Sequence, residues 1–298
     1  MVDFERCYAR KGNEMGIFSG VFGTKATEGV DVEKRFEFLS KPINGSMSTY
    51  QPVRKRTSSK VYGLKILHAS KTTQFRERFK GLDLPSEAEV TSSFDHDNIV
   101  RLIDSGRTKR DQDYLLLEHC DGIRLDEAIT LAKKNSAQPK SVLLLEMIRA
   151  VGVVHDAGFI HRDICPRNFF LDVKTGRIKL FDFGVSLPNK PEFLQPGNRT
   201  GSTMYLAPEI VRRRSCDLRA DIFALGVSMF ELLAWQHPWE GCSSSLDFDT
   251  QDPASLASLC PDLDENLAKV IHRCIEPNPE YRFEGIKQLL FAFRGIMK

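Results

Sequence analysis

Two polar motifs at the centre of the chain restrict its possible folds and chemistry more than any other feature. The segment His161–Asn168 reads His-Arg-Asp-Ile-Cys-Pro-Arg-Asn, and Asp182-Phe183-Gly184 begins fourteen residues after its end. An Asp followed five positions later by Asn, and then by a second Asp before Phe-Gly, can supply a carboxylate for an incoming hydroxyl and oxygen ligands for Mg²⁺. Because phosphoryl transfer needs little else from a protein, these residues indicate that reaction.

A third motif, Gly201–Glu209, reads Gly-Ser-Thr-Met-Tyr-Leu-Ala-Pro-Glu. With the two central motifs, it makes the chain resemble the eukaryotic-type (Hanks-type) Ser/Thr protein kinase family over roughly residues 36 to 298. The resemblance implies that Glu209 closes an activation segment and forms an ion pair with the distant Arg282. It also implies that Asp221, which begins an apolar helix, holds the backbone of the catalytic loop, since a buried acid needs a partner.

Strand-rich and helix-rich segments follow one another along the chain. The pattern predicts strands from about residue 36 to 67, a helix near 74–94, and strands near 100–118. The remainder is expected to be mostly helical, with a short β ribbon beside the catalytic loop. This order of elements predicts an α+β fold.

The resemblance adds a domain organisation to this fold class. It implies a bilobal protein-kinase-like fold, with a β-rich N-lobe at about residues 36–118 and a helical C-lobe at about 121–298. Residues 1–35 precede the protein kinase domain of residues 36–298 and are expected to form an N-terminal extension.

A lysine interrupts the apolar strand Val61–Leu67, and by itself it would be read as a side chain that extends to solvent at an edge strand. When the motifs that follow it in the sequence are taken into account, Lys65 instead matches the lysine that holds the α- and β-phosphates of ATP in kinases. The family pattern places its carboxylate partner nine residues before His96, at Glu87. Glu89 stays open as an alternative, since helix registers read from sequence are uncertain by a residue or two.

The phosphate-covering glycine loop departs from the family pattern. An ungapped alignment from Lys65 places it on Ile43–Tyr50, where Gly45 is the one glycine kept of the usual three. Glycines allow the backbone to approach phosphates closely, so we expect nucleotide binding at Gly45 to be weaker than with a complete loop. A second glycine cluster, Gly16–Gly23, lies too far before Lys65 to be joined to it by one short hairpin and is assigned to the extension.

The connector between the lobes is predicted at Tyr114–Gly122, an apolar strand that ends in polar residues. By the resemblance, Leu117 would border the back of the nucleotide pocket, and Glu118 and Cys120 would offer backbone groups to the adenine edge. Phe170, two residues after Asn168, would lie under the purine ring.

Two further departures lie beside the expected catalytic base, Asp163. Cys165 stands where Ser/Thr kinases usually carry a lysine, and we expect it to be a small buried hydrophobe. Arg167 could supply the missing positive charge from another direction and is therefore included among the catalytic residues. The Gly201-Ser202 pair resembles the Ser/Thr type of substrate platform, with Ser202 assigned to positioning of the acceptor.

Regulation by phosphorylation is expected from Arg162, which precedes Asp163 and in kinases commonly binds a phosphorylated residue of the activation segment. Thr200 is the leading candidate for that residue and Thr203 the second. The helix that carries Glu87 offers few apolar anchors, so we expect it to depend on this loop or on a partner.

Composition sets wider limits on partners and compartment. The formal net charge of +2 gives no case for nucleic acid or a membrane surface as partner. Seven scattered cysteines argue against both a disulfide framework and a zinc site. The apolar stretch Val142–Ile160 is interrupted by charged residues and is expected to be an amphipathic helix that ends at Gly158, not a membrane span. The N-terminus does not resemble a signal peptide, so a cytoplasmic location is expected.

These observations lead to the hypothesis of a Ser/Thr protein kinase that uses ATP and Mg²⁺ and has a protein substrate. Asp163 would act on the acceptor hydroxyl, Asn168 and Asp182 would hold metal, and Lys65 with Glu87 would position phosphates. The alternatives are a pseudokinase scaffold that binds nucleotide without efficient transfer and a kinase of small molecules. The sequence names neither the protein substrate nor the oligomeric state.

Overall fold

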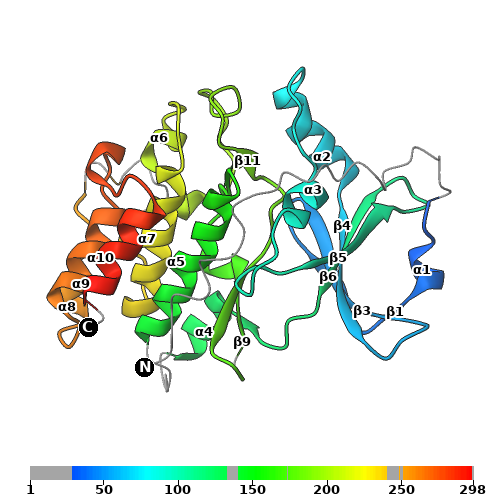
Figure 1. Ribbon diagram of the computed structural model, residues 1–298, viewed down its shortest axis with the longest axis horizontal. Coiled ribbons are helices and arrows are strands. Elements are labelled where there is room, and N and C mark those ends of the chain that lie inside the picture. Colours follow the sequence, from blue (N-terminus) through cyan, green and yellow to red (C-terminus); the bar gives the residue numbers. More distant parts are fainter. Residues whose placement is uncertain (1–28, 133–139, 173, 240–247, 249–250, 297–298) are drawn as a thin grey trace, which may run out of the picture.

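A strand-rich half and a helix-rich half lie side by side in the protein (Figure 1). The structure is a computed structural model that describes residues 29–132, 140–172, 174–239, 248 and 251–296. The Gly16–Gly23 cluster and most of the expected N-terminal extension lie outside the described residues. The division into a β-rich N-lobe and a helical C-lobe confirms the predicted α+β, bilobal fold class.

The N-lobe is built on one antiparallel sheet with the order β1-β3-β4-β6-β5, in which β2 also pairs with β3. Its strands are β1 (Phe36–Phe38), β2 (Ile43–Asn44), β3 (Ser48–Lys55), β4 (Val61–Leu67), β5 (Leu102–Arg107) and β6 (Asp113–Glu118). One face carries the buried Tyr62, Leu64 and Leu116. Because side chains alternate along a strand, Lys65 lies on the other face, which is turned toward the C-lobe.

The described part of the expected extension contacts this sheet. Val30 forms an isolated bridge with Thr108, and the short helix α1 (Val32–Arg35) leads directly into β1. The boundary expected at residue 35 stays a prediction.

The prediction of a single helix near residues 74–94 is wrong. The structure has α2 (Ala69–Arg76), a 3₁₀ turn at Glu77–Phe79, and a separate helix α3 (Glu87–Ser92). Gly81 between them adopts a φ of +87°, a conformation that ends a helix. Ser86 then begins α3 with a capping box, in which its side chain accepts from the Glu89 N–H and the Glu89 carboxylate accepts from the Ser86 N–H.

The C-lobe surrounds helix α7 (Arg219–Ala234), of whose sixteen residues thirteen are buried. A helix apolar on all sides belongs in a core, and α7 packs against both α5 and α9 (Figure 1). The other C-lobe helices are α4 (Leu125–Ala132), α5 (Lys140–Asp156), α6 (Pro208–Val211), α8 (Leu256–Leu259), α9 (Glu265–Cys274) and α10 (Ile286–Ile296). Within the residues that the structure describes, no helix combines the length and apolar character needed to cross a membrane.

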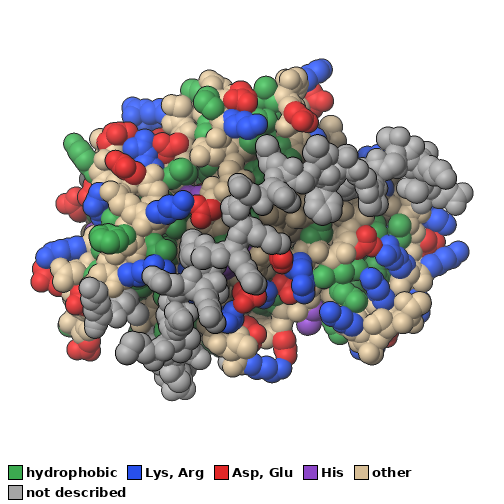
Figure 2. Space-filling model, in the orientation of Figure 1, with side chains coloured by type: hydrophobic (Ala, Val, Ile, Leu, Met, Phe, Trp, Pro, Cys, Tyr) green, Lys and Arg blue, Asp and Glu red, His purple; other side chains and the backbone are tan. Residues whose placement is uncertain are grey.

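Short strands flank the catalytic loop, as the sequence predicts. They are β7 (Ile123–Arg124), β8 (Phe159–Ile160), β9 (Phe169–Asp172), β10 (Arg177–Leu180) and β11 (Leu187–Pro188), in the pairings β10-β9-β7 and β11-β8. They hold the His161–Asn168 and Asp182–Gly184 segments between the lobes. On the face seen in Figure 2, both acidic and basic side chains are present on each lobe.

The predicted ion pair between Glu209 and Arg282 is present and buried. Arg282 donates from Nη1 and Nη2 to the two carboxylate oxygens of Glu209 at 2.8 and 2.9 Å. Its remaining N–H groups donate to the backbone carbonyls of Glu276, Arg219 and Pro277, so all five donors are satisfied. The pair fastens the end of the activation segment to the base of the C-lobe.

We predict that Glu209→Ala lowers the free energy of unfolding by about 3–5 kcal/mol, because it leaves the Arg282 charge buried without its counter-ion. Glu280→Ala is the matched control, since it removes a carboxylate from the exposed pair with Arg219 and should cost at most about 1 kcal/mol. Urea unfolding of both variants checks this. Similar losses in the two would contradict the role assigned to the buried pair.

Candidate active site

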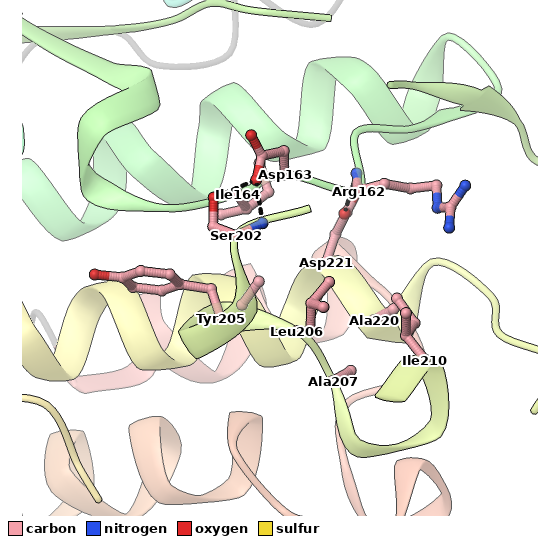
Figure 3. Close-up of a pocket in the computed structure, with 11 residues that line it drawn as sticks. Arg162, Asp163, Ile164, Ser202, Tyr205, Leu206, Ala207, Ile210, Ala220 and Asp221 are labelled. Atoms are coloured by element: carbon pink, nitrogen blue, oxygen red, sulfur yellow. Dashed lines mark hydrogen bonds between the residues drawn. The ribbon is translucent and has the colours of Figure 1, made fainter. Parts of the chain in front are cut away.

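Asp221, in the first turn of α7, fixes the backbone of the catalytic loop, which is the segment His161–Asn168. Its carboxylate accepts from the backbone N–H groups of His161 and Arg162, both at 2.8 Å, as the sequence analysis expected. It also contacts Nε2 of His155 on α5 at 2.9 Å. Burial alone would raise the pKa of Asp221, but the hydrogen bonds and charges of His155 and His161 outweigh it and hold that pKa below its usual range. Figure 3 shows Asp221 beneath Arg162.

Asp163 lies at the centre of a hydrogen-bonded group. The amide nitrogen of Asn168 donates to the Asp163 carbonyl at 2.7 Å and to its Oδ2 at 3.1 Å. On the other side, the Ser202 N–H donates to Asp163 Oδ1 at 2.7 Å, and the Ser202 hydroxyl donates to the same oxygen (Figure 3). Gly201 makes this approach possible, because its φ is +127° and a Cβ there would lie 2.5 Å from the Arg162 carbonyl oxygen.

Arg167 is next to this group and partly exposed. Its Nη2 donates to the Ser202 hydroxyl at 2.5 Å and lies 3.7 Å from Asp163 Oδ2. A fixed positive charge therefore stands beside the carboxylate at the mouth of the site. Whether that charge acts on a phosphate stays a prediction.

Cys165 is fully buried, as the sequence analysis expected of a small hydrophobe. Its Sγ lies 3.5 Å from the Ser202 hydroxyl oxygen. Burial, with the nearby Asp163 carboxylate as a second cause, raises the pKa of the Cys165 thiol to about 12. The side chain is therefore neutral at physiological pH.

Lys65 joins three segments of the chain in one charge cluster. Its Nζ forms ion pairs with Glu87 Oε1 on α3 and, at 2.8 Å, with Asp182 Oδ1. Burial would lower the pKa of Lys65, but the Asp182 and Glu87 carboxylates outweigh it and raise that pKa. Glu89 is instead occupied by the capping box of α3, so the structure resolves the open choice in favour of Glu87.

The donor set suits a hard cation such as Mg²⁺. Asn168 uses its amide nitrogen for Asp163, which leaves its amide oxygen for a ligand. Asp182 gives one oxygen to Lys65, and its side chain is 38% exposed. In the described part of the chain no cluster of three or more His, Cys, Asp or Glu could hold a metal alone. Mg²⁺ binds through one or two carboxylates together with phosphates and water, so Asp182 and Asn168 could contribute ligands to it.

The residues assigned to nucleotide binding lie in the β2–β3 turn, at and after the end of β6, and on β9. Gly45 lies in the turn between β2 and β3, where its N–H donates to the Ser48 carbonyl at 2.8 Å. Glu118 ends β6, its carboxylate is 2.7 Å from Lys179 Nζ, and Cys120 follows it. Phe170 on β9 is partly buried, with its ring 5.5 Å from that of Phe181. Their contacts with a nucleotide stay predictions.

Two functional contacts were missed by the sequence analysis. One is His155, which supports Asp221 from a helix face six residues before His161. The other is Arg78, just after α2, whose Nη1 donates to the Thr200 hydroxyl at 2.9 Å. No local sequence signal links Arg78 to a residue so far along the chain. Arg162 donates to the Asn198 carbonyl, while its buried Nε and Nη1 have no hydrogen-bond partner among the described residues.

Comparison with known proteins agrees with this arrangement. The family model of the protein kinase domain matches residues 41–291. The probable serine/threonine-protein kinase PknB of Corynebacterium glutamicum is 27% identical over 273 residues, which is 87% of this chain and 41% of that protein. Serine/threonine-protein kinase PrkC of Bacillus subtilis is 28% identical over 269 residues, 88% of this chain and 40% of the relative. The chain thus spans about two fifths of the length of these curated relatives.

We predict that the Cys165 thiol of the folded protein resists alkylation by iodoacetamide near pH 8. The thiolate is the reactive species, and a pKa of about 12 leaves only about one thiol in ten thousand ionised at that pH. Because burial raises the pKa, labelling should rise only as the pH approaches the pKa. Peptide mass spectrometry measures it, with urea-denatured protein as the control that reacts. Labelling of Cys165 at equal rates in folded and denatured protein would contradict the assignment.

Proposed function

Because the chain belongs to the protein kinase family, we propose that it is a Ser/Thr protein kinase that transfers the γ-phosphate of ATP to hydroxyl groups of a protein substrate. The observation that carries this proposal is the set of contacts around Asp163. Its carboxylate already accepts a hydrogen bond from a serine hydroxyl, that of Ser202, which is the geometry an acceptor hydroxyl needs. The amide nitrogen of Asn168 is bonded to the same Asp, and we assign its amide oxygen to the metal.

Each charged residue of the site then has a separate task. Asp163 orients the acceptor oxygen and takes its proton as the new O–P bond forms and the bond from the γ-phosphorus to the bridging oxygen of ATP breaks, which releases ADP. Lys65, which is paired with Glu87, binds the α- and β-phosphates. Arg167 faces the γ-phosphate and takes the role of the lysine that Ser/Thr kinases usually carry at the position of Cys165. Mg²⁺, when held by Asn168 and Asp182, would neutralise phosphate charge during transfer.

The alternatives considered from the sequence have less support. A pseudokinase would not need Lys65, Asp163, Asn168 and Asp182 together in one cleft. A small-molecule kinase would not need the Gly201–Glu209 platform that places Ser202 on Asp163. Seven scattered cysteines argue against a disulfide framework, so we propose a reducing compartment, the cytoplasm, as the site of action.

We predict that Asp163→Asn lowers phosphotransfer by about 10²–10⁴-fold, while the affinity for ATP changes by no more than a few-fold. The asparagine oxygen can still accept from the Ser202 N–H, so the loop should keep its shape. Transfer of radiolabelled phosphate to a generic protein acceptor, with phosphoamino-acid analysis, measures the first quantity, and calorimetry measures the second.

Asp182→Ala is the matched comparison for that experiment. It should remove the dependence of ATP binding on Mg²⁺, which Asp163→Asn should retain. Wild-type turnover in Asp163→Asn would show that the assigned base is wrong. A wild-type protein that binds no ATP with millimolar Mg²⁺ would refute the proposed function as a whole.

We predict that the protein autophosphorylates at Thr200 and that this raises its activity at least about fivefold. A phosphate on Thr200 would lie beside Arg78 and could engage the free guanidinium nitrogens of Arg162 with charge-assisted hydrogen bonds. Mass spectrometry before and after phosphatase treatment locates the phosphate, and both forms are assayed. Thr200→Ala should remain at the activity of the dephosphorylated form.

Thr203→Ala is the control for this prediction, since Thr203 is the second candidate in the same segment. Equal activity of the phosphorylated and dephosphorylated proteins would contradict it. So would the absence of phosphate between Val185 and Leu206.

A further inference from the structure

A histidine in the C-lobe holds the segment on which a protein substrate would lie. His237 follows the end of α7, and its Nε2 lies 3.0 Å from the carbonyl oxygen of Met204. Met204 belongs to the 3₁₀ turn Thr203–Tyr205, in the middle of the Gly201–Glu209 segment that we call the substrate platform. The contact therefore joins the end of α7 to the platform across 33 positions of the sequence.

The contacts of the His237 ring fix its protonation state. A carbonyl oxygen can only accept a hydrogen bond, so Nε2 carries the proton that is donated to Met204. On the other side of the ring, the backbone nitrogen of Trp239 lies 3.2 Å from Nδ1. That N–H can only donate, so Nδ1 is unprotonated and accepts. The geometry thus requires the neutral imidazole with its proton on Nε2.

Aromatic rings pack around His237. Its ring centroid lies 5.7 Å from that of Phe248 and 6.0 Å from those of Trp239 and Tyr205. Phe248 and Trp239 are stacked with their centroids 4.0 Å apart, and both are almost completely buried. This packing takes the imidazole partly out of water and lowers the pKa of His237 below its ordinary value. The neutral form is therefore favoured at physiological pH.

The titratable groups that face His237 come from the platform and from α7. Tyr205 on the platform meets the His237 ring at an interplanar angle of 82°. Its hydroxyl donates to the Glu231 carboxylate of α7 at 2.5 Å, so Glu231 lies behind the tyrosine. Burial raises the pKa of Tyr205 and that of Glu231, so Tyr205 stays neutral where a histidine titrates. In the described part of the chain, the other groups packed on the ring are the uncharged Met204 carbonyl, Trp239 and Phe248.

The substrate platform is held at three points, of which His237 is one. Ser202 is bonded to the catalytic base, and Tyr205 to a carboxylate of α7. In Figure 3, the Ser202 side chain points toward Asp163 and the Tyr205 ring extends away from it. Met204 lies between these two residues, and its carbonyl is fixed by His237. Loss of that bond would leave both ends of the turn attached but free the peptide group between them.

We propose that neutral His237 is a positioning residue for the protein substrate, which holds the substrate platform through the Met204 carbonyl and releases it on protonation. This inference rests on the proposed function for the identity of the ligand, a polypeptide with an acceptor hydroxyl. A second proton on the ring would sit on Nδ1 and face the Trp239 N–H, so that two donors would oppose each other. Because the imidazolium cannot keep both contacts, the ring must turn away from the platform.

The test compares the pH dependence of phosphotransfer by the full chain with that of His237→Gln. The KM of the acceptor, myelin basic protein, the KM of ATP and kcat are measured between about pH 5.5 and 7.5. Each is expressed relative to His237→Gln at the same pH, because this ratio cancels the titration of the acceptor, of ATP and of Glu231. The ratio of acceptor KM values should rise about fivefold toward the acid end, as for the loss of one hydrogen bond. The other two ratios should stay within about twofold.

His237→Gln and His237→Asn form a matched pair that separates the two contacts of the ring. The Gln amide nitrogen takes the place of Nε2 and can donate to Met204 at every pH. The Asn amide oxygen takes the place of Nδ1 and can only accept from Trp239. At neutral pH, His237→Gln should keep the acceptor KM of the wild type within about twofold, whereas His237→Asn should raise it about fivefold. Equal behaviour of the two variants would overturn the proposal.

His272→Gln is the control for a partly buried histidine of the same lobe. His272 lies on α9, where its Nε2 accepts from the Leu256 N–H at 3.1 Å and its ring contacts that of Phe230. Burial lowers its pKa as well, but none of these contacts involves the platform. The variant should keep both the acceptor KM and its pH dependence. If it abolished the pH dependence as His237→Gln does, the titration would belong to the C-lobe as a whole and the proposal would be wrong.

Nitrogen NMR of the wild type tests the proposal independently of activity. Long-range proton–nitrogen spectra distinguish a protonated from an unprotonated ring nitrogen, and the spectrum of His237→Gln identifies the His237 signals by their absence. At neutral pH, Nε2 should be protonated and Nδ1 should not. The midpoint of the titration should coincide with that of the rise in acceptor KM. The opposite tautomer, or an imidazolium at neutral pH, would refute the assigned role.

The remaining outcomes separate this proposal from the proposed function. Phosphotransfer with an acceptor KM ratio that does not change with pH overturns the role of His237 and leaves the kinase activity standing. A pH-dependent ratio confined to the KM of ATP or to kcat overturns it likewise. A wild type that transfers no phosphate at any pH overturns both, because the platform would then position no acceptor.

Discussion

One buried carboxylate, Asp221, carries the geometry of the catalytic loop. It begins the most buried helix of the C-lobe and receives two backbone N–H groups of the loop, from His161 and Arg162. Arg162 adopts a φ of +67°, a conformation that costs a non-glycine residue about 1–2 kcal/mol. Hydrogen bonds to a charged acceptor are strong enough to offset this cost. Because Asp163 is the next residue, its position depends on Asp221 as well.

Lys65 joins segments of the two lobes, as Asp221 joins α7 to the catalytic loop. Its two carboxylate partners come from α3 in the N-lobe and from the Asp182 segment next to the C-lobe. Beneath this cluster, the Phe183 ring packs 4.8 Å from that of Phe94, which follows α3. Apolar packing thus holds together the two segments that the charges join.

The sequence predicted the parts of the site that are set by motif spacing. The buried Glu209–Arg282 pair and the Asp221 contacts followed from motifs, because each joins a buried charge to a partner in another motif. The prediction of one helix near residues 74–94 was wrong, because a turn at Gly81 and the cap at Ser86 divide this segment. The contact between Arg78 and Thr200 could not be predicted from the sequence, since it depends on how the folded lobes place two exposed segments.

Two pairs of residues in the structure complement each other in space. Cys165 removes a positive charge from the catalytic loop, and Arg167 places one 3.7 Å from Asp163. Tyr50 adds a ring to β3, and Gly63 on β4 removes the side chain that would collide with it. In the first pair a positive charge lies near the position of the one that is missing, and in the second a large ring is accommodated where a side chain is missing. The proposed transfer reaction gives a physical reason for the first pair, because the γ-phosphate would need a positive charge close to Asp163.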